Sequence, residues 1–145
     1  MRSKITPGLI FFFVPYVLVI GAYYGVRHLG QGISFIEHRD VLGGTMSTYS
    51  GTMIAILIAA LTFMLGIGGR NARKLKAYGY MSSVAILYAL TFVELGMIFL
   101  TGIFLMATSK IPIPLLPSIS IGMAAASLVH ISIVMIQIFG FSKNQ

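Results

Sequence analysis

The sequence predicts an all-α membrane protein whose four transmembrane helices form an antiparallel bundle. Of its 145 residues, 57% are hydrophobic and 9% are charged, and the mean hydropathy is +0.94. A soluble domain carries about 25% charged residues, so this chain has too few to cover a surface that faces water. The apolar stretches are long and continuous, unlike the roughly ten-residue alternation of a membrane β-barrel. We therefore expect a single four-helix transmembrane domain over residues 1–145.

Four segments are long enough to cross a bilayer, which takes about 20 apolar residues. The first, about residues 9–26, runs past signal-peptide length and lacks an obvious small-residue cleavage site, so we expect it to be retained. The second covers about residues 49–69. The third, about residues 78–108, is longer than the bilayer requires and should tilt or project beyond the lipid. The fourth covers about residues 116–141.

Basic residues concentrate in segments that would lie on one side of the membrane. The net charge is +7, from ten Lys and Arg against three Asp and Glu. Seven of the ten are at the chain ends or in the linker after the second span: Arg2, Lys4, Arg70, Arg73, Lys74, Lys76 and Lys143. The positive-inside rule then places both termini in the cytoplasm. We expect the linker residues to contact anionic lipid or a cytosolic partner, with no direct binding of nucleic acid.

The chain offers little for enzyme chemistry or for binding a metal or cofactor. It contains no cysteine, which excludes disulfides, thiolate nucleophiles and Cys-based metal sites. It also lacks an HExxH motif, and the glycines from Gly66 to Gly69 do not have the GxxxxGK[ST] spacing of a phosphate loop. We therefore expect no catalytic residues, no metal site and no cofactor.

The first external loop, roughly residues 27–48, holds the polar triplet His38, Arg39 and Asp40. A histidine in this position could sense pH, since an unperturbed imidazole titrates near neutral pH. The simpler interpretation is a solvated loop with local ion pairs. The second external loop, about residues 109–117, contains three prolines, which would end the third helix and stiffen the turn.

Glu94 lies where a carboxylate is costly, deep in the third predicted span. A charged side chain near the centre of a membrane helix costs roughly 2.5–3.5 kcal/mol on insertion scales, and such residues mark ion or proton pathways. His130 is similarly deep in the fourth span, and both residues stand eighteen positions from Pro112. If the two helices form a hairpin about that proline, Glu94 and His130 reach a similar depth. We therefore predict that they approach each other, within one chain or between chains.

Two interpretations of this pair stay open. A carboxylate beside an imidazole holds charge in a low dielectric more readily than either group alone, so the pair could simply lock the bundle. Alternatively, Glu94 belongs to a proton or cation route that His130 tunes. In that case Thr91 and Thr101, on the same face of the third helix, would belong to the route as well.

Small and hydroxyl residues form a stripe along the second span. They recur at spacings of four and three residues: Thr48, Thr52, Ala55, Ala59, Thr62 and Gly66. Small side chains let helices approach closely in lipid, where no hydrophobic force assembles them. The stripe is therefore either a packing seam or the lining of a pore, in which Thr48, Thr52 and Thr62 would supply hydroxyl groups.

Several segments resemble the RexB family, the membrane ion-channel components of RexA/RexB exclusion systems of the phage lambda type. The similarity is carried by SFIEHRD at residues 34–40, GTMIAILIAALTF at 51–63, YGYMS at 78–82, FVELG at 92–96 and IGMAAAS at 121–127. The resemblance covers nearly the whole chain. It includes the polar triplet at residues 38–40, which chance similarity between apolar helices would not reproduce.

This resemblance implies a four-helix protein of the bacterial inner membrane, encoded by a prophage and acting as an ion channel. It also implies a cytosolic RexA-like partner that senses phage protein–DNA complexes and triggers the channel. The membrane then depolarises and the infection aborts, which gives superinfection exclusion. A family member is also credited with inhibiting the proteolysis of certain unstable proteins.

We therefore expect a gated channel that passes monovalent cations or protons. It should be a homo-oligomer, because four thin helices leave little room for a pore within one subunit. One alternative is a small proton-coupled transporter, in which Glu94 alternately binds a proton and a substrate. Another is a non-conducting membrane adaptor that inhibits proteolysis, in which Glu94 only packs the bundle.

Overall fold

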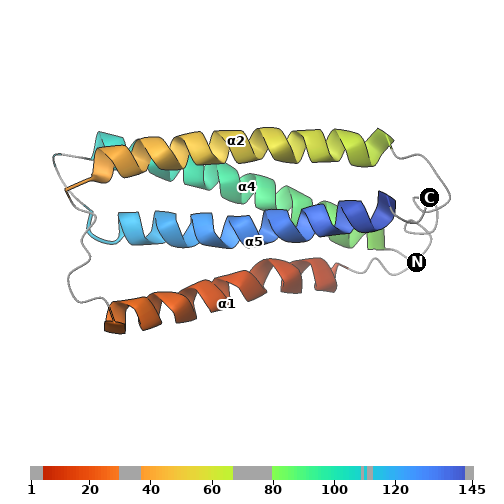
Figure 1. Cartoon of the computed structure of the whole chain (residues 1–145), viewed down its shortest axis with the longest axis horizontal. Coiled ribbons are helices and arrows are strands. Elements are labelled where there is room, and N and C mark those ends of the chain that lie inside the picture. The colour runs from red at the N-terminus through yellow and green to blue at the C-terminus, as the bar shows by residue number, and fades with distance from the viewer. Residues whose placement is uncertain (1–4, 30–36, 67–79, 109, 111–112, 143–145) are drawn as a thin grey trace.

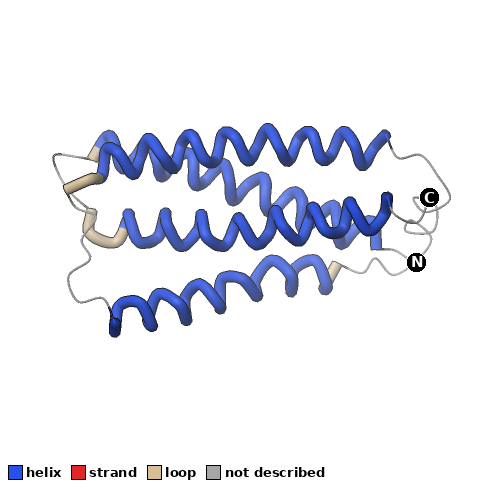
Figure 2. The backbone as a smooth tube through the Cα atoms, in the orientation of Figure 1, coloured by secondary structure: helices blue, strands red, loops and turns tan. Residues whose placement is uncertain are grey.

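The computed structural model of the chain describes residues 5–29, 37–66, 80–108, 110 and 113–142. All regular structure in this part of the chain is helical (Figure 2). The helices are α1 (Thr6–Leu29), α2 (Arg39–Gly66), α4 (Tyr80–Ala107) and α5 (Leu116–Ser142). Each contains a stretch long and apolar enough to cross a membrane. The prediction of an all-helical protein with four potential spans is confirmed.

The bounds of α1, α4 and α5 lie within a few residues of the predicted spans, but α2 starts much earlier than predicted. It begins at Arg39, whereas the sequence predicted an external loop up to residue 48. That prediction was wrong because glycines and polar residues also occur inside a helix where it packs closely on a neighbouring helix. In the structure Asp40 lies in the first turn of the helix, where a carboxylate interacts favourably with the helix dipole. Gly43 lies where α2 packs closely on α4.

The α2–α4 interface is the most extensive in the bundle, and Gly43 and Gly102 pack closely against each other within it. A Cβ atom added to Gly102 would lie 2.5 Å from Ser47 Oγ and 2.8 Å from the Gly43 carbonyl oxygen. One added to Gly43 would lie 2.6 Å from the Gly102 carbonyl oxygen. The two glycines therefore set the distance between these backbones, as small residues commonly do between membrane helices.

The interior of the bundle contains both apolar and polar side chains. Its fully buried apolar residues include Leu57, Leu87, Leu95, Ile98 and Val134. Hydroxyl groups join the helices around them. The Tyr88 hydroxyl donates to the Leu57 carbonyl and connects α4 to α2. The Tyr49 hydroxyl lies 2.8 Å from Ser127 Oγ and connects α2 to α5. These bonds satisfy polar groups whose burial would otherwise be unfavourable.

Helix α1 lies along one side of the bundle, mainly against α4 and α5 (Figure 1). In its membrane-length stretch 6% of the residues are buried, against 39% in α4 and 33% in α5. One close contact is at Gly8, where an added Cβ would lie 2.6 Å from the Ser83 carbonyl oxygen. Most of α1 therefore faces outward, and its main neighbours are α4 and α5.

Candidate functional site

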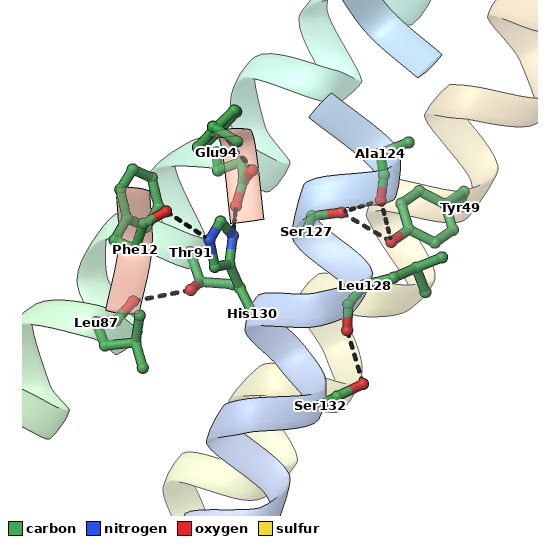
Figure 3. Close-up of polar contacts among 11 residues, drawn as sticks. Phe12, Tyr49, Leu87, Thr91, Glu94, Ala124, Ser127, Leu128, His130 and Ser132 are labelled. Carbon is green, nitrogen blue, oxygen red and sulfur yellow. Dashed lines mark hydrogen bonds and ion pairs between the residues drawn. The ribbon is translucent and has the colours of Figure 1, made fainter. Parts of the chain in front are cut away.

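Glu94 and His130 meet inside the bundle. Glu94, from the middle of α4, is 3% exposed, and His130, from the middle of α5, is fully buried. His130 Nδ1 lies 2.6 Å from Glu94 Oε2 (Figure 3). Among the described residues this is the one contact between a carboxylate and a basic side chain within 4.0 Å. The predicted approach of the two residues is confirmed, and it occurs within a single chain.

Two groups from α1 complete this site. The Tyr16 hydroxyl donates to Glu94 Oε1, and His130 Nε2 lies 2.8 Å from the Phe12 carbonyl oxygen. The Phe12 ring also stacks on the imidazole, with ring centroids 4.6 Å apart and planes inclined by 12°. Pro15 has no N–H, so the carbonyl that lacks its usual helical donor is that of Phe11, one residue before Phe12. We call Phe12, Tyr16, Glu94 and His130 the three-helix cluster.

The partners within the three-helix cluster determine where its protons lie. A carbonyl oxygen only accepts hydrogen bonds, so His130 Nε2 carries a hydrogen that it donates to Phe12. Tyr16 donates to one oxygen of Glu94, and the other oxygen faces His130 Nδ1. One proton lies between these last two atoms, on Nδ1 as an ion pair or on Oε2 as a neutral pair. Both arrangements leave the cluster without net charge, which suits a buried site.

This geometry limits what Glu94 can bind. Both carboxylate oxygens already accept or share a hydrogen bond, one with α1 and the other with α5. Each oxygen keeps a second lone pair, but the residue is 3% exposed, so a cation reaches Glu94 only if the packing around it opens. A proton, by contrast, can move between Nδ1 and Oε2 without such an opening. In the described part of the chain no group of three or more His, Asp or Glu side chains is arranged to hold a metal ion.

The two threonines predicted to accompany Glu94 lie on the same helix. Thr91 is fully buried one turn before Glu94, and its hydroxyl donates to the Leu87 carbonyl at 2.8 Å (Figure 3). Thr101 is half-buried and donates to the Ile98 carbonyl at 2.9 Å. Because each hydroxyl hydrogen is used within α4, the hydroxyl oxygens keep acceptor capacity for another donor or for a cation.

The threonines of α2 are not brought to the cluster. Thr48, Thr52 and Thr62 are exposed, as are Ala55 and Ala59 of the same stripe. The hydroxyls of Thr52 and Thr62 donate to carbonyl groups one turn earlier in α2. The buried face of this helix is a different one, which includes Leu57 and Ala60. A single chain therefore has polar groups in two separate places. The three-helix cluster lies inside the bundle, and the threonines of the α2 stripe lie on its outer surface.

The polar triplet at the start of α2 is divided by the fold. His38 and Asp40 are exposed, but Arg39 is only 2% exposed. Arg39 Nη2 donates to the Ile113 carbonyl at 3.0 Å, just before α5. The interpretation as a solvated loop is therefore wrong for Arg39, because α2 extends to this residue and carries it into the bundle.

The basic linker predicted to contact a partner or lipid lies outside the described residues. Its members are Arg70, Arg73, Lys74 and Lys76.

Sequence reasoning missed the α1 members of the three-helix cluster. A signal for Tyr16 was present, because this residue lies near the middle of the first predicted span, at the depth expected for Glu94 and His130. For Phe12 no such signal exists, since it contributes its carbonyl oxygen and its ring face. The Tyr49–Ser127 contact, one turn before His130, was missed as well.

The chain matches a known family over nearly its full length. A family model described as RexB, a membrane-anchored ion channel and Abi component, matches residues 6–145. The chain is also 49% identical over 145 residues to Protein rexB of Escherichia phage lambda, with 100% of this chain and 99% of that protein covered. The chain belongs to the RexB family. No solved structure matches it.

Membership of the RexB family makes this chain a membrane-anchored ion-channel component of an abortive-infection system. Four helices capable of spanning a membrane agree with that description. The resemblance identified from residues 34–40 and the helical segments is thus confirmed. For this RexB-family protein the structure adds a site in which Glu94 of α4, His130 of α5 and two residues of α1 are joined by hydrogen bonds.

Proposed function

We propose that this RexB-family protein forms a gated channel for monovalent cations or protons in the bacterial inner membrane. A cytosolic RexA-like sensor would open it, the membrane would depolarise, and the infection would abort. The observation that carries this proposal is the burial of Glu94 in the middle of a membrane-length helix, beside His130. An ionisable residue at that depth is costly unless it is paired, and such residues mark ion pathways.

We further propose an antiparallel bundle with both termini in the cytoplasm. In Figure 1 the start of α1, the end of α2, the start of α4 and the end of α5 lie at the same end of the bundle. Seven of the ten Lys and Arg belong to the segments adjoining these helix ends. The positive-inside rule assigns that end to the cytoplasm. The linker with Arg70, Arg73, Lys74 and Lys76 would then be available to a cytosolic sensor or anionic lipid.

The ion route has two possible parts. Glu94 and His130, with Thr91 and Thr101, would form a part within each chain. Thr48, Thr52 and Thr62 are exposed, so they can line the route only where copies of the chain meet in a homo-oligomer. Variants distinguish the two parts of the route. Loss of the carboxylate at Glu94 changes the part within one chain, and loss of the α2 hydroxyls changes the part between chains.

The first test is Glu94→Gln in purified protein reconstituted into liposomes. Glutamine has the same size but no charge. We expect its unitary cation current to fall by roughly tenfold, or about 1.4 kcal/mol, because an amide oxygen binds a cation more weakly than a carboxylate oxygen does. Thr52→Val, which removes one exposed α2 hydroxyl, is the matched variant for the route between copies. Single-channel recording at equal protein incorporation measures both.

The outcomes separate the candidate functions. An unchanged current in Glu94→Gln would remove this residue from the route. No current from wild-type protein, shown to be folded and inserted and given its cytosolic partner, would contradict the channel. A proton-coupled transporter is then the second candidate, because one proton is shared between His130 and Glu94. Substrate-dependent proton movement would identify it, and its absence as well would favour the non-conducting adaptor.

A further inference from the structure

Glu94 is closed to cations in this structure, and α1 supplies one of the groups that close it. Tyr16 donates to Oε1, while Oε2 is shared with His130 Nδ1. The carboxylate is also buried, with the whole residue 3% exposed. Tyr16 of α1 and His130 of α5 cover the two oxygens, so conduction past an accessible Glu94 requires that one of these helices moves away.

Of the two donors, Tyr16 is on the helix that is held less firmly. His130 belongs to α5, which packs on α1, α2 and α4. In the membrane-length stretch of α1 only 6% of the residues are buried. In the described part of the chain, the hydrogen bonds that join α1 to other helices are those of Tyr16 to Glu94 and of His130 to the Phe12 carbonyl. Both end at the buried pair.

We propose that α1 is the gate of the channel, and that Tyr16 and the Phe12 carbonyl hold it closed against Glu94 and His130. Movement of α1 away from α4 and α5 removes the Tyr16 donor from Oε1 and the aromatic cover from the imidazole. The carboxylate then has a free oxygen for a cation. Tyr16 is in this scheme a positioning residue that controls access to Glu94. The proposal rests on the channel function proposed above, but it concerns a different helix.

The first experiment removes one hydroxyl group from α1. Tyr16→Phe keeps the ring and loses the donor to Glu94. In potassium-loaded vesicles without any partner protein, we expect it to raise potassium efflux about tenfold over wild type, which corresponds to about 1.4 kcal/mol in the closed-to-open equilibrium. Tyr24→Phe is the matched control, because Tyr24 lies on the same helix and is 64% exposed. It should conduct like wild type.

The second experiment locks α1 in place. A Cβ added to Gly122 of α5 would lie 3.5 Å from Val19 Cγ1 of α1, a separation that a disulfide can bridge with a small adjustment. The chain has no cysteine of its own, so Val19→Cys with Gly122→Cys forms one defined bond. Introduced into Tyr16→Phe, the oxidised pair should return efflux to the wild-type level, and reduction should restore the leak. Each cysteine alone should have no effect.

A distance measurement judges the gate independently of current. Spin labels on Val17→Cys of α1 and Leu128→Cys of α5, both exposed sites, report the separation of these helices. Tyr16→Phe should broaden the distance distribution toward longer values, and Tyr24→Phe should not. If no variant conducts but this broadening occurs, α1 release by loss of Tyr16 is supported and the channel function fails. The proposal is overturned if Tyr16→Phe leaves efflux and distances unchanged, or if the oxidised lock leaves the leak intact.

Discussion

Glu94 and His130 share a buried site in which every polar side-chain atom has a partner. The two carboxylate oxygens and the two ring nitrogens are used by Tyr16, by the Phe12 carbonyl and by each other. An unpaired charge at this depth would be strongly destabilising, whereas a fully hydrogen-bonded pair without net charge is tolerated. The bundle can therefore bury two ionisable residues mainly because all four of these atoms are hydrogen-bonded, and less because Glu94 and His130 attract each other.

Replacing Glu94 should therefore affect stability according to the hydrogen bonds that remain. Glu94→Gln can still accept from Tyr16 and can donate its N–H to His130 Nδ1, so the free energy of unfolding should change by less than about 1 kcal/mol. Glu94→Ala leaves both partners unpaired and should lower it by about 2–4 kcal/mol. Thermal unfolding in one detergent, followed by circular dichroism, measures the difference. Equal losses in the two variants would show that hydrogen-bond satisfaction does not stabilise the site.

At the scale of the helices, the α2–α4 crossing depends on the absence of side chains at two positions. Gly43 and Gly102 face each other at distances that leave no room for a Cβ atom. This contact lies in the first half of α2, within the stretch whose polarity suggested a loop. The first turns of α2 are thus helical and packed closely on α4, although their glycines and polar residues do not by themselves favour a helix.

Gly102→Ala should push α2 away from α4 and lower the free energy of unfolding by about 1–3 kcal/mol, the usual effect of overpacking. Gly96→Ala is the matched control, since Gly96 is on the same helix and an added Cβ has no neighbour within 4 Å. That variant should keep or slightly raise stability, because alanine favours helix more than glycine does. Unfolding midpoints of the two proteins give the comparison. Equal decreases would contradict a specific role of the crossing.

For the whole molecule, we expect copies of the chain to meet at the exposed stripe of α2. Ala55→Leu and Ala59→Leu add bulk to this outer surface and should reduce the oligomer while leaving the monomer folded. Ala85→Leu, at an exposed position of α4, is the control for added bulk outside the stripe. Light scattering in detergent reports the assembly size. Unchanged size in both stripe variants, or an equal loss in all three, would exclude the stripe as the interface.

Orientation in the membrane can be tested at the same scale, because the chain has no cysteine. With both termini in the cytoplasm, Lys110→Cys should react with a membrane-impermeant maleimide in intact spheroplasts. Lys143→Cys should react only after the membrane is permeabilised. The reverse pattern would place the basic segments outside and contradict the positive-inside assignment.

The helical membrane class, the number of spans and the pairing of Glu94 with His130 were predictable from the sequence. A span is defined by the length and polarity of one continuous segment, which is local information. The equal spacing of the two residues from Pro112 set their depth along two helices of a hairpin. The depth of a residue in the bilayer follows from its position along its helix, and the sequence gives that position directly.

The rotation of each helix about its axis was decided by tertiary structure. This rotation directs Tyr16 and the Phe12 carbonyl toward the buried pair and leaves Thr48, Thr52 and Thr62 on the outside. Tertiary packing also accompanies the extension of α2 to Arg39, which is buried. These features depend on which helices touch and how closely, through contacts such as Gly43 with Gly102 between residues far apart in the chain. In α1, whose sequence is almost uniformly apolar, no periodic pattern marks the side that faces the protein, so packing alone determines it.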